Sequence, residues 1–434
     1  MKEGPTVEQV EIDRGINYSG YREALELVYT HIHTVGIDEI TITEGAGRIS
    51  AENITARISH PSGDVSLKDG FAVQSSDIAE ASPGKPIRLR IIGESFAGSK
   101  FEGEVRHGSA VSICSGSPIP DGADAVVSSE FCEEGVPDVR VRADAGPGRN
   151  ILRAGEDIEA GSVIVGKDSV LLPGQLGLAA AGGIEKIKVY RRPRVALIAI
   201  GDEVVAPGRH LRPGQLYASN IVTTGAWLDV FGIPFTTGIV GDNRDAISGE
   251  LVRCLPGVDT VITSGGAWVS ERDLVAGVLD ELGWNKVFHH VRMGPGKGIV
   301  FGILEDKPVF CLPGGPASNE MAFLQFALPG ILRMAGQTGP PLPTVSARLM
   351  KDVNSRDRNW TEFRDAILDR DTDGNYTVTP YLERSRLQAI ARANCLICIP
   401  EGVDSLHKGD TIPVQVLMPA SSGLSPTRER QGQI

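Results

Sequence analysis

The sequence feature that most constrains the fold is an alternation of apolar runs with helix-like segments between residues 194 and 336. Two of the runs, VALIAI at 195–200 and TVITS at 260–264, are followed at once by glycine-containing turns, and a helical pattern lies between them at 246–255. Such a β-α-β-α rhythm is typical of a parallel sheet covered by helices. We therefore predict a doubly wound α/β domain at 193–337, with its ligand at the carboxyl ends of the strands.

Short strands with alternating apolar and polar residues flank this domain on both sides. Between about Ile87 and Val141 such runs are separated by Gly and Pro, and similar runs return after Pro341. Nearer the start, residues 21–35 have the spacing of an amphipathic helix. The predicted divisions are 10–60 with 145–192 as a mixed α/β linker domain, 61–144 as a small β domain, 343–418 as a C-terminal β domain and 421–434 as a flexible tail.

The balance of charge argues against two classes of partner. The chain has 43 Lys and Arg against 55 Asp and Glu, so its formal net charge is −12 and it repels phosphate backbones and anionic lipid. The first ten residues lack an apolar leader core, and no apolar run is long enough to cross a bilayer. We therefore expect a cytoplasmic protein that binds neither nucleic acid nor membrane.

The cysteines do not point to a metal or redox site. Only Cys395 and Cys398 form a C-x-x-C pair, and they lie in a run that reads as a strand. Residues three apart on a strand face opposite sides. We interpret both as core residues, since free cysteine tends to be buried.

Glycine-rich and acidic residues follow several strands of the predicted α/β domain. Backbone N–H groups of such turns approach phosphates closely, although each turn taken alone is also common as a structural element. Carboxylates beside phosphate-binding loops usually hold Mg²⁺, and Lys297 adds either a cation for an anion or an exposed loop lysine. The segments are Gly201-Asp-Glu203, Gly241-Asp242, Ser264-Gly265-Gly266 with Asp273, and Pro313-Gly-Gly-Pro316.

Taken in order, the motifs of the chain resemble the MoeA family of molybdopterin molybdenumtransferases, which includes the gephyrin E domain. The resemblance runs from about Gly20 to Leu417. The segments that carry it are Ser66-Leu-Lys-Asp-Gly-Phe-Ala72, Pro118-Ile-Pro-Asp-Gly-Ala-Asp124, Gly148-Arg-Asn-Ile-Leu-Arg153, Gly155-Glu-Asp157, Gly201-Asp-Glu203, Tyr217-Ala-Ser-Asn220, the run from Ser264 to Asp273, Pro295-Gly-Lys297 and Leu312-Pro-Gly-Gly-Pro316.

The resemblance implies both an architecture and an activity. The fold would be a multidomain α/β plus β chain: a MogA-like α/β domain, a β-barrel-like insertion and a C-terminal β domain, assembled as an elongated homodimer. The activity would lie in molybdenum cofactor biosynthesis, where molybdate is inserted into adenylylated molybdopterin with Mg²⁺ and AMP and molybdenum cofactor are released. A MogA-type adenylyltransferase and molybdoenzyme apoproteins would be partners.

The resemblance also implies roles for individual residues. Catalytic roles fall to Asp69, Asp157, Glu203 and Asp273, and Mg²⁺ would be held by Glu203, Asp242 and Asp273. Substrate would be bound by Ser264, Gly265, Gly266, Trp268, Lys297, Pro313, Pro316, Arg364 and Ser385. The alternatives are caps or turns for Asp69 and Asp157, and an exposed strand arginine and a turn serine for the Arg364 and Ser385 pair.

Several departures from the family pattern cluster at the expected pocket. Gly294-Pro-Gly-Lys297-Gly298 lacks one family lysine and a proline, and His290 aligns with another lysine, so two cationic positions are weakened because histidine is largely neutral at pH 7. Arg292, Arg384 and Arg386 are candidate replacements. Trp268 stands where a small hydroxyl residue is expected, and either stacks on the pterin or adenine or plugs the site. Smaller departures are Lys68 and Gly315.

These departures leave three hypotheses open. The first is an active metal-insertion enzyme, selective for molybdate or for tungstate. The second is a paralogue that binds the pterin or a partner protein without turnover. The third is a nucleotide hydrolase of the kind found in competence-damage proteins, which the β domains on both sides of the α/β domain disfavour.

Overall fold

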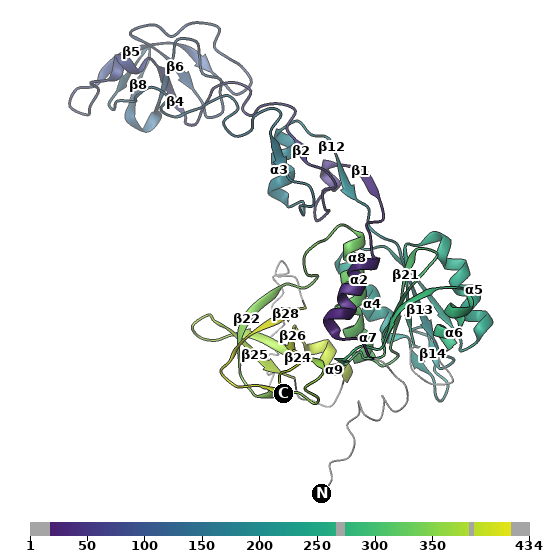
Figure 1. Ribbon diagram of the computed structural model, residues 1–434. Helices are drawn as coiled ribbons and strands as arrows, with labels where there is room; N and C mark the ends of the chain where they lie inside the picture. The colour runs from purple at the N-terminus through teal and green to yellow at the C-terminus, as the bar shows by residue number, and fades with distance from the viewer. Residues whose placement is uncertain (1–17, 266–273, 382–385, 418–434) are drawn as a thin grey trace. The chain divides into compact units, whose positions relative to one another are not determined.

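The computed structural model describes residues 18–265, 274–381 and 386–417. They form two compact units, one made of Ile37–Val189 and the other of the chain on both sides of it (Figure 1). No helix among the described residues is long and apolar enough to cross a membrane. The predicted tail at 421–434 lies outside the described residues.

The unit Ile37–Val189 contains a small mixed region and an inserted sheet. In the mixed region β1 (Ile37–Thr41) pairs with β12 (Lys186–Tyr190), and β2 (Ile54–Thr55) pairs with β11 (Val163–Val165) beside helix α3 (Pro173–Ala181). Its core is a cluster of buried aliphatic side chains that includes Ile54, Leu171 and Ile187. Strands β3 (Val65–Ser66) and β10 (Ile151–Leu152) pair where the chain enters and leaves the insertion.

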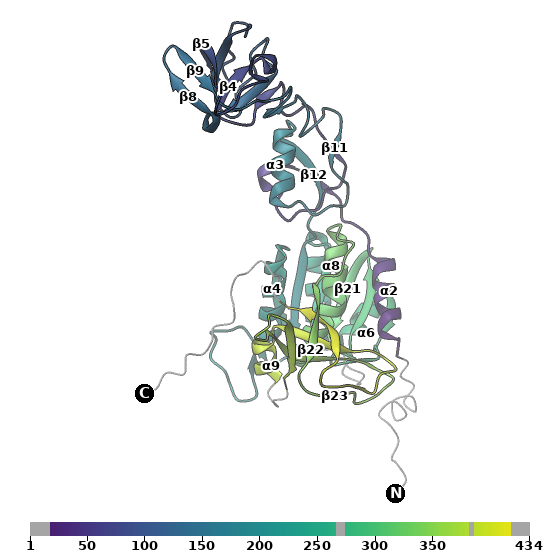
Figure 2. The same cartoon turned by 90° about the vertical axis from the view of Figure 1, so that its left-hand side faces the viewer.

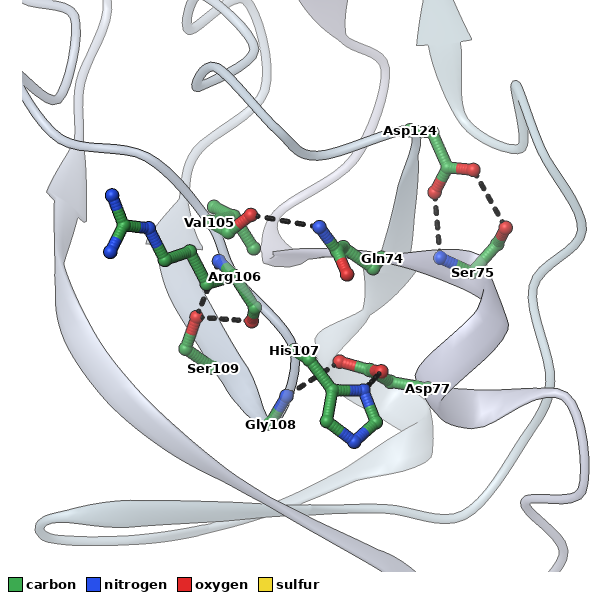
Figure 3. A network of polar contacts seen from close by, with 9 residues as sticks. All are labelled: Gln74, Ser75, Asp77, Val105, Arg106, His107, Gly108, Ser109 and Asp124. Atoms are coloured by element: carbon green, nitrogen blue, oxygen red, sulfur yellow. Dashed lines mark hydrogen bonds and ion pairs between the residues drawn. The ribbon is translucent and has the colours of Figure 1, made fainter.

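The insertion is a six-stranded sheet in the order β7-β4-β6-β5-β9-β8. Its strands are β4 (Gly70–Val73), β5 (Ile87–Ser95), β6 (Ser109–Ile113), β7 (Ala125–Ser128), β8 (Cys132–Gly135) and β9 (Asp138–Val141). Polar contacts tie its loops together: the carboxylate of Asp77 accepts from His107 and from the Gly108 N–H, and Asp124 accepts from the N–H and the hydroxyl of Ser75 (Figure 3). These two aspartates therefore fix the turns beside β4 and β6.

A six-stranded sheet in the order β16-β13-β17-β21-β20-β18 forms the centre of the other unit. Strands β13 (Val195–Ile200), β16 (Phe235–Val240), β17 (Thr260–Ser264) and β21 (Lys307–Leu312) are parallel, while β18 (Asn285–His289) and β20 (Val300–Leu304) run antiparallel to their neighbours. Every residue of β13 is buried, and alternate side chains enter two different cores. The doubly wound α/β prediction is confirmed.

Helices cover both faces of this sheet, as Figure 1 shows. Helices α5 (Arg244–Cys254) and α6 (Leu274–Glu281) pack on one face. The other face carries α4 (Ser219–Val230) and the buried helical stretch of α7 (Pro316–Ala322), η5 (Phe323–Ala327) and α8 (Leu328–Met334). The described small strands of this domain are β14 (Val204–Val205), β15 (Leu216–Tyr217) and β19 (Met293–Gly294).

Helix α2 (Tyr21–His31) packs in this α/β core, whereas its sequence was assigned to the linker domain at 10–60. Ala24 and Val28 are fully buried together with Phe310 and Phe326, so the apolar face of the helix covers the sheet. The helix ends at His31, four residues earlier than the pattern at 21–35 suggests. Amphipathic spacing identifies a face that must be covered but does not say by which domain.

The C-terminal domain is a closed five-stranded barrel. The strands pair in the order β24-β25-β22-β28-β26, and β26 pairs back onto β24. They are β22 (Thr344–Leu349), β24 (Thr361–Arg370), β25 (Tyr376–Pro380), β26 (Cys395–Ile399) and β28 (Thr411–Val416), with a small pair β23 (Val353–Asn354) and β27 (Ser405–Leu406). Cys395 lies in the barrel core, and burial raises the pKa of its thiol to about 12.

The barrel and the α/β domain are joined through shared packing. Strand β19 of the α/β domain extends the barrel sheet beside β24, and Phe363 is buried in the same core as α2, where its ring meets the edge of the Tyr21 ring at 5.5 Å. Helix α9 (Arg386–Arg392) of the barrel contacts α7 (Figure 1), and Figure 2 shows α9 and β22 of the barrel below α4 and α8 of the α/β domain. The loops of the two domains are therefore held against each other.

A half-buried ion pair ties the start of the α/β domain to its sheet. Asp259 accepts two hydrogen bonds from the Arg191 guanidinium, at 2.7 and 2.8 Å, and a third from the Arg194 N–H at 2.7 Å. Burial opposes ionisation of this carboxyl, but the donors of Arg191 and Arg194 outweigh burial and hold its pKa below the usual 3.8. The pair is therefore a source of stability that depends on the charge of Asp259.

We predict that Asp259→Asn lowers the free energy of unfolding at pH 7 by about 1–2 kcal/mol, because charge-assisted hydrogen bonds are lost from a partly exposed pair. A lowered carboxyl pKa stabilises the fold above pH 3.8 and ceases to do so as the pH falls through the folded-state value. Urea unfolding from pH 7 to pH 3 should thus show a constant difference between variant and wild type down to about pH 4, and a shrinking one below. Glu281→Gln, which breaks an exposed pair with Arg244, is the control and should change little. A difference that grows as the pH falls would contradict the assignment.

Candidate functional site

A cavity of about 650 Å³ lies at the carboxyl ends of the parallel strands. It brings together five of the residues singled out in the sequence: Glu203, Asp242, Ser264, Gly265 and Pro316. Its remaining lining residues come from the end of β13, from β14, β15 and the start of α4, from the turn before α7 and from α9. The edge of the sheet predicted to bind the ligand is therefore hollowed, and it carries both carboxylates and a glycine turn.

Glycine is required where the sheet meets this cavity. Gly265 has φ +98°, and a Cβ there would lie 2.5 Å from the Ile200 carbonyl oxygen of the neighbouring strand. At Gly241 a Cβ would lie 2.5 Å from Oδ1 of Asp202, which accepts a hydrogen bond from the Asp242 N–H at 3.0 Å. Asp202 is thus a turn-forming residue that presents Asp242, and backbone lines the cavity at these turns.

Two asparagines that the sequence did not single out as site residues hold Ser264. Asn220 and Asn319 each place the side-chain nitrogen 3.0 Å from the Ser264 hydroxyl oxygen. Asn220 belongs to the Tyr217-Ala-Ser-Asn220 motif. Asn319 lies on α7 and belongs to no sequence motif; its side chain is buried, and it is 55 residues away from Ser264 in the sequence. Pro313 lies at the edge of this arrangement, where its carbonyl accepts from Asn319 at 2.9 Å.

A second cavity, of about 950 Å³, lies between the α/β domain and the barrel. Successive residues of α7 line the two cavities, with Pro316 in the first and Ala317 and Ser318 in the second. Helix α9 likewise contributes Leu387 to the first and Arg386 to the second. The two cavities are therefore neighbours across the starts of two helices.

The second cavity is rich in cations. Both Lys297 and Arg364, which the resemblance predicts to bind substrate, line it. Three further arginines do so as well: Arg356, Arg358 and Arg386. Of these, Arg386 was considered in the sequence, but Arg356 and Arg358 belong to a barrel loop that no motif marked. Guanidinium groups donate several N–H bonds in one plane, which suits a tetrahedral oxoanion.

Lys297 lies beside two aromatic rings that contact each other, with their centroids 5.3 Å apart. Its ammonium nitrogen is 5.8 Å from the Trp360 ring and 6.0 Å from the Tyr18 ring, distances at which the negative face of a ring attracts a cation. Trp360 also lines the second cavity. The single lysine left in the G-P-G-K-G segment is thereby held in place by rings from the barrel and from the segment before α2.

Two other basic positions considered from the sequence, His290 and Arg292, do not line either cavity, and Arg384 lies outside the described residues. His290 is buried, with its ring stacked on His289 at 3.8 Å and meeting the Tyr18 ring at 5.3 Å. Arg292 donates to the Tyr18 carbonyl at 3.0 Å and pairs with Glu401. The described cations that line the second cavity are therefore Lys297 and the barrel arginines and not Arg292, because the side chains at 290 and 292 lie in the core and against the segment before α2.

Glu362 organises the floor of the second cavity. Its carboxylate is almost fully buried; one oxygen accepts from the N–H groups of Arg356 and Asp357, at 2.6 and 3.2 Å, and from the Ser355 hydroxyl at 3.2 Å. The other oxygen pairs with the Arg364 guanidinium. Glu362 therefore fixes both the loop that carries Arg356 and the orientation of Arg364.

Two other carboxyl groups near the cavities resist ionisation. Burial raises the pKa of Glu320 on α7 to about 7, against a hydrogen bond from the Trp227 indole that lowers it, and the nearby Asp365 charge raises it further. Asp365 lines the second cavity, and burial raises its pKa too. Neutralising these groups would leave the arginines as the dominant charge in this part of the site.

The remaining sequence-predicted residues divide into two groups. Asp69 and Asp157 are exposed and belong to the unit Ile37–Val189. The Asp69 carboxylate accepts from the Ser115 N–H at 2.6 Å, which is the turn-forming contact considered as its alternative role, and the Asp157 N–H donates to the His60 carbonyl. Gly266, Trp268, Asp273 and Ser385 lie outside the described residues.

Comparison with known proteins matches nearly the whole chain in three segments. Residues 20–183 match the model of the MoeA N-terminal region (domains I and II), 196–333 that of a probable molybdopterin binding domain, and 346–417 that of the MoeA C-terminal region (domain IV). The chain is 33% identical over 381 residues to molybdopterin molybdenumtransferase 2 of Mycobacterium tuberculosis, covering 86% of this chain and 94% of the relative. It is 31% identical to molybdopterin molybdenumtransferase of Haemophilus influenzae, covering 87% and 93%.

Solved structures agree with these matches. A crystal structure of the molybdopterin biosynthesis MoeA protein from Pyrococcus horikoshii superimposes with a TM-score of 0.77 at 32% identity, covering 93% of this chain and all of that one. The fold and the segments together define a multidomain protein built around an α/β domain of the molybdopterin-binding type. The chain belongs to the MoeA family, as its ordered motifs predicted.

We predict that Glu362→Gln lowers the free energy of unfolding by roughly 1–3 kcal/mol, because Arg364 loses its charge partner while the shape of the side chain is kept. An added tetrahedral oxoanion such as sulfate should raise the melting temperature more in the variant than in the wild type, since the anion can replace the missing carboxylate. Thermal unfolding with and without sulfate measures both effects. Glu401→Gln, which removes the partner of Arg292 away from the cavity, is the matched control. Equal sulfate shifts in all three proteins would contradict this account of the cavity floor.

Proposed function

We propose that the protein is a molybdopterin molybdenumtransferase, which inserts molybdate into adenylylated molybdopterin with Mg²⁺ and releases AMP and molybdenum cofactor. The observation that carries the proposal is the adjacency of two cavities of different chemistry across the start of α7. The first offers carboxylates and glycine turns, which suit a metal-bound phosphate. The second offers arginines and a lysine, which suit an oxoanion.

The described residues fit a magnesium ion in the first cavity. Glu203 and Asp242 both line it and supply carboxylate oxygens, the ligand type that Mg²⁺ prefers. Among the described residues no group of three or more acidic, cysteine or histidine side chains could hold a metal ion. Mg²⁺ commonly takes only one or two carboxylates, with water and substrate phosphates as its other ligands, so the pair is consistent with it. Bound there, it would neutralise the pyrophosphate and polarise it as a Lewis acid.

In the second cavity Lys297 and Arg364 would hold the oxoanion, assisted by Arg356 and Arg386. Donors fixed in advance bind a tetrahedral anion with little reorganisation. The ring contacts of Lys297 and the Glu362 contact of Arg364 provide this fixation. The choice between molybdate and tungstate then depends on this cavity, and we take molybdate as the substrate.

The other parts of the proposal follow from family membership. Asp69, Asp157 and Asp273 are proposed as catalytic carboxylates, and Gly266, Trp268 and Ser385 as substrate contacts. We also propose a cytoplasmic homodimer that receives its substrate from a MogA-type adenylyltransferase and delivers its product to molybdoenzyme apoproteins. The structural support for the proposed function comes from the ends of the parallel strands and not from these residues.

The direct test is release of AMP from adenylylated molybdopterin in the presence of Mg²⁺ and molybdate. We expect turnover by the wild type, and a rate lower by roughly 100-fold in Glu203→Gln, because the loss of a magnesium ligand removes a few kcal/mol of charge stabilisation. Glu281→Gln should match the wild type, since Glu281 is exposed on α6 and does not line the cavity.

Parallel reactions with tungstate separate the open alternatives. AMP release only with tungstate would replace molybdate as the substrate and leave the class of reaction intact. Binding of the adenylylated pterin without AMP release by either oxoanion would overturn the enzymatic proposal in favour of a pterin-binding paralogue. Turnover of free dinucleotides at a similar rate would favour a nucleotide hydrolase.

A further inference from the structure

The Ser264 hydroxyl has an unusual pair of partners. It sits at the end of β17 on the wall of the first cavity, and the amide nitrogens of Asn220, at the start of α4, and Asn319, on α7, both lie 3.0 Å from its oxygen. Each amide nitrogen also lies close to a backbone carbonyl of the turn before α7: Asn220 to Gly314 at 2.8 Å and Asn319 to Pro313 at 2.9 Å. Four segments of the α/β domain meet in these contacts.

The backbone carbonyls of Pro313 and Gly314 determine which group is the donor in these hydrogen bonds. A backbone carbonyl oxygen only accepts, so the NH₂ group of each asparagine, and not its oxygen, must face the turn. An NH₂ group has two hydrogens, and in each asparagine one goes to the carbonyl and the other to the Ser264 oxygen. The Asn319 oxygen is left for the Thr224 hydroxyl, 3.5 Å away, which agrees with this orientation.

These contacts determine which hydrogen bond the Ser264 hydroxyl can still make. A serine oxygen accepts two hydrogen bonds and donates one, and here both acceptor sites are used. Among the described residues the Ser264 hydroxyl donates no hydrogen bond, and the group lines the cavity. A hydroxyl in this state can only donate, which suits an anionic oxygen and not a hydrogen-bond donor.

We propose that Asn220 and Asn319 are positioning residues that turn Ser264 into a fixed hydrogen-bond donor for a phosphate oxygen of the nucleotide. The inference rests on the proposed function, because that function places a nucleotide phosphate in the first cavity. It goes further by assigning a role to two amides that act through the serine, of which Asn220 also lines the cavity and Asn319 does not. The same contacts connect the Pro313-Gly-Gly-Pro316 turn to β17, so the phosphate donor and the wall that separates the two cavities are set by one network.

The test is a double-mutant cycle on AMP binding, with AMP itself as the probe in calorimetric titration. We expect Ser264→Ala and Asn319→Ala each to weaken AMP binding by about 10-fold, the effect of losing one hydrogen bond to a charged group. The combined variant should bind within about two-fold of Ser264→Ala, because Asn319 acts only through the serine. Asn220→Ala, alone and combined with Ser264→Ala, repeats the cycle should Asn319→Ala fail to fold.

Controls separate positioning from general loss of structure. Gln325→Leu removes another buried amide of the same helical stretch, one that bonds Tyr21 and Gln415 instead, and should leave AMP binding unchanged even where stability falls. Asn319→Asp keeps the shape but replaces the donating NH₂ by an acceptor, so it should weaken AMP binding more than Asn319→Ala does. If the two losses of AMP affinity multiply to about 100-fold in the combined variant, the positioning role is overturned while the nucleotide site remains. Absence of AMP binding by the wild type would overturn the nucleotide site, and with it the proposed function.

Discussion

Burial of the parallel strands on both faces is the constraint on which the rest of the α/β unit depends. A strand whose residues are all buried, as in β13, leaves no solvated face and must be covered by helices on each side. Each crossover then brings the chain back in the same direction, so the ends of β13, β17 and β21 fall at one edge. Polar groups can reach a ligand only at that edge, which is where the first cavity lies.

Burial of the elements that cover the sheet also determines where the second cavity lies. Helix α7 leaves the sheet edge through the turn at 313–316 and continues as a fully buried helical stretch, so its direction is fixed by packing. The barrel is held against this helix by Phe363 and by strand β19. The barrel cations therefore lie beside the first cavity because packed helices and strands hold them there.

The sequence predicted the features of the fold that follow from hydrophobic periodicity and from turn residues. Buried β-branched runs and glycine turns predicted the α/β domain and its ligand edge, and the carboxylates Glu203 and Asp242 follow strands closely enough to be placed there. Asn319 could not be found in this way, since a buried amide within a helix has no periodic signature and its partner Ser264 lies 55 residues away. Arg356 and Glu362 were missed for a related reason: only closure of the barrel brings their loop and strand to the cavity. Arg292, a candidate replacement cation in the sequence, does not line the second cavity, because a place in the sequence does not fix where a side chain points.

The second cavity takes most of its positive charge from arginines. A lysine ammonium is a mobile point charge, whereas a guanidinium directs its donors in a plane and needs a partner to orient it. Glu362 is the orienting acceptor of Arg364, and its other oxygen accepts from the N–H groups of Arg356 and Asp357. The cavity is lined by five cationic side chains and three carboxyl groups, so positive charge is in excess there even with every carboxyl ionised. Burial raises the pKa of Asp365, which adds to this excess.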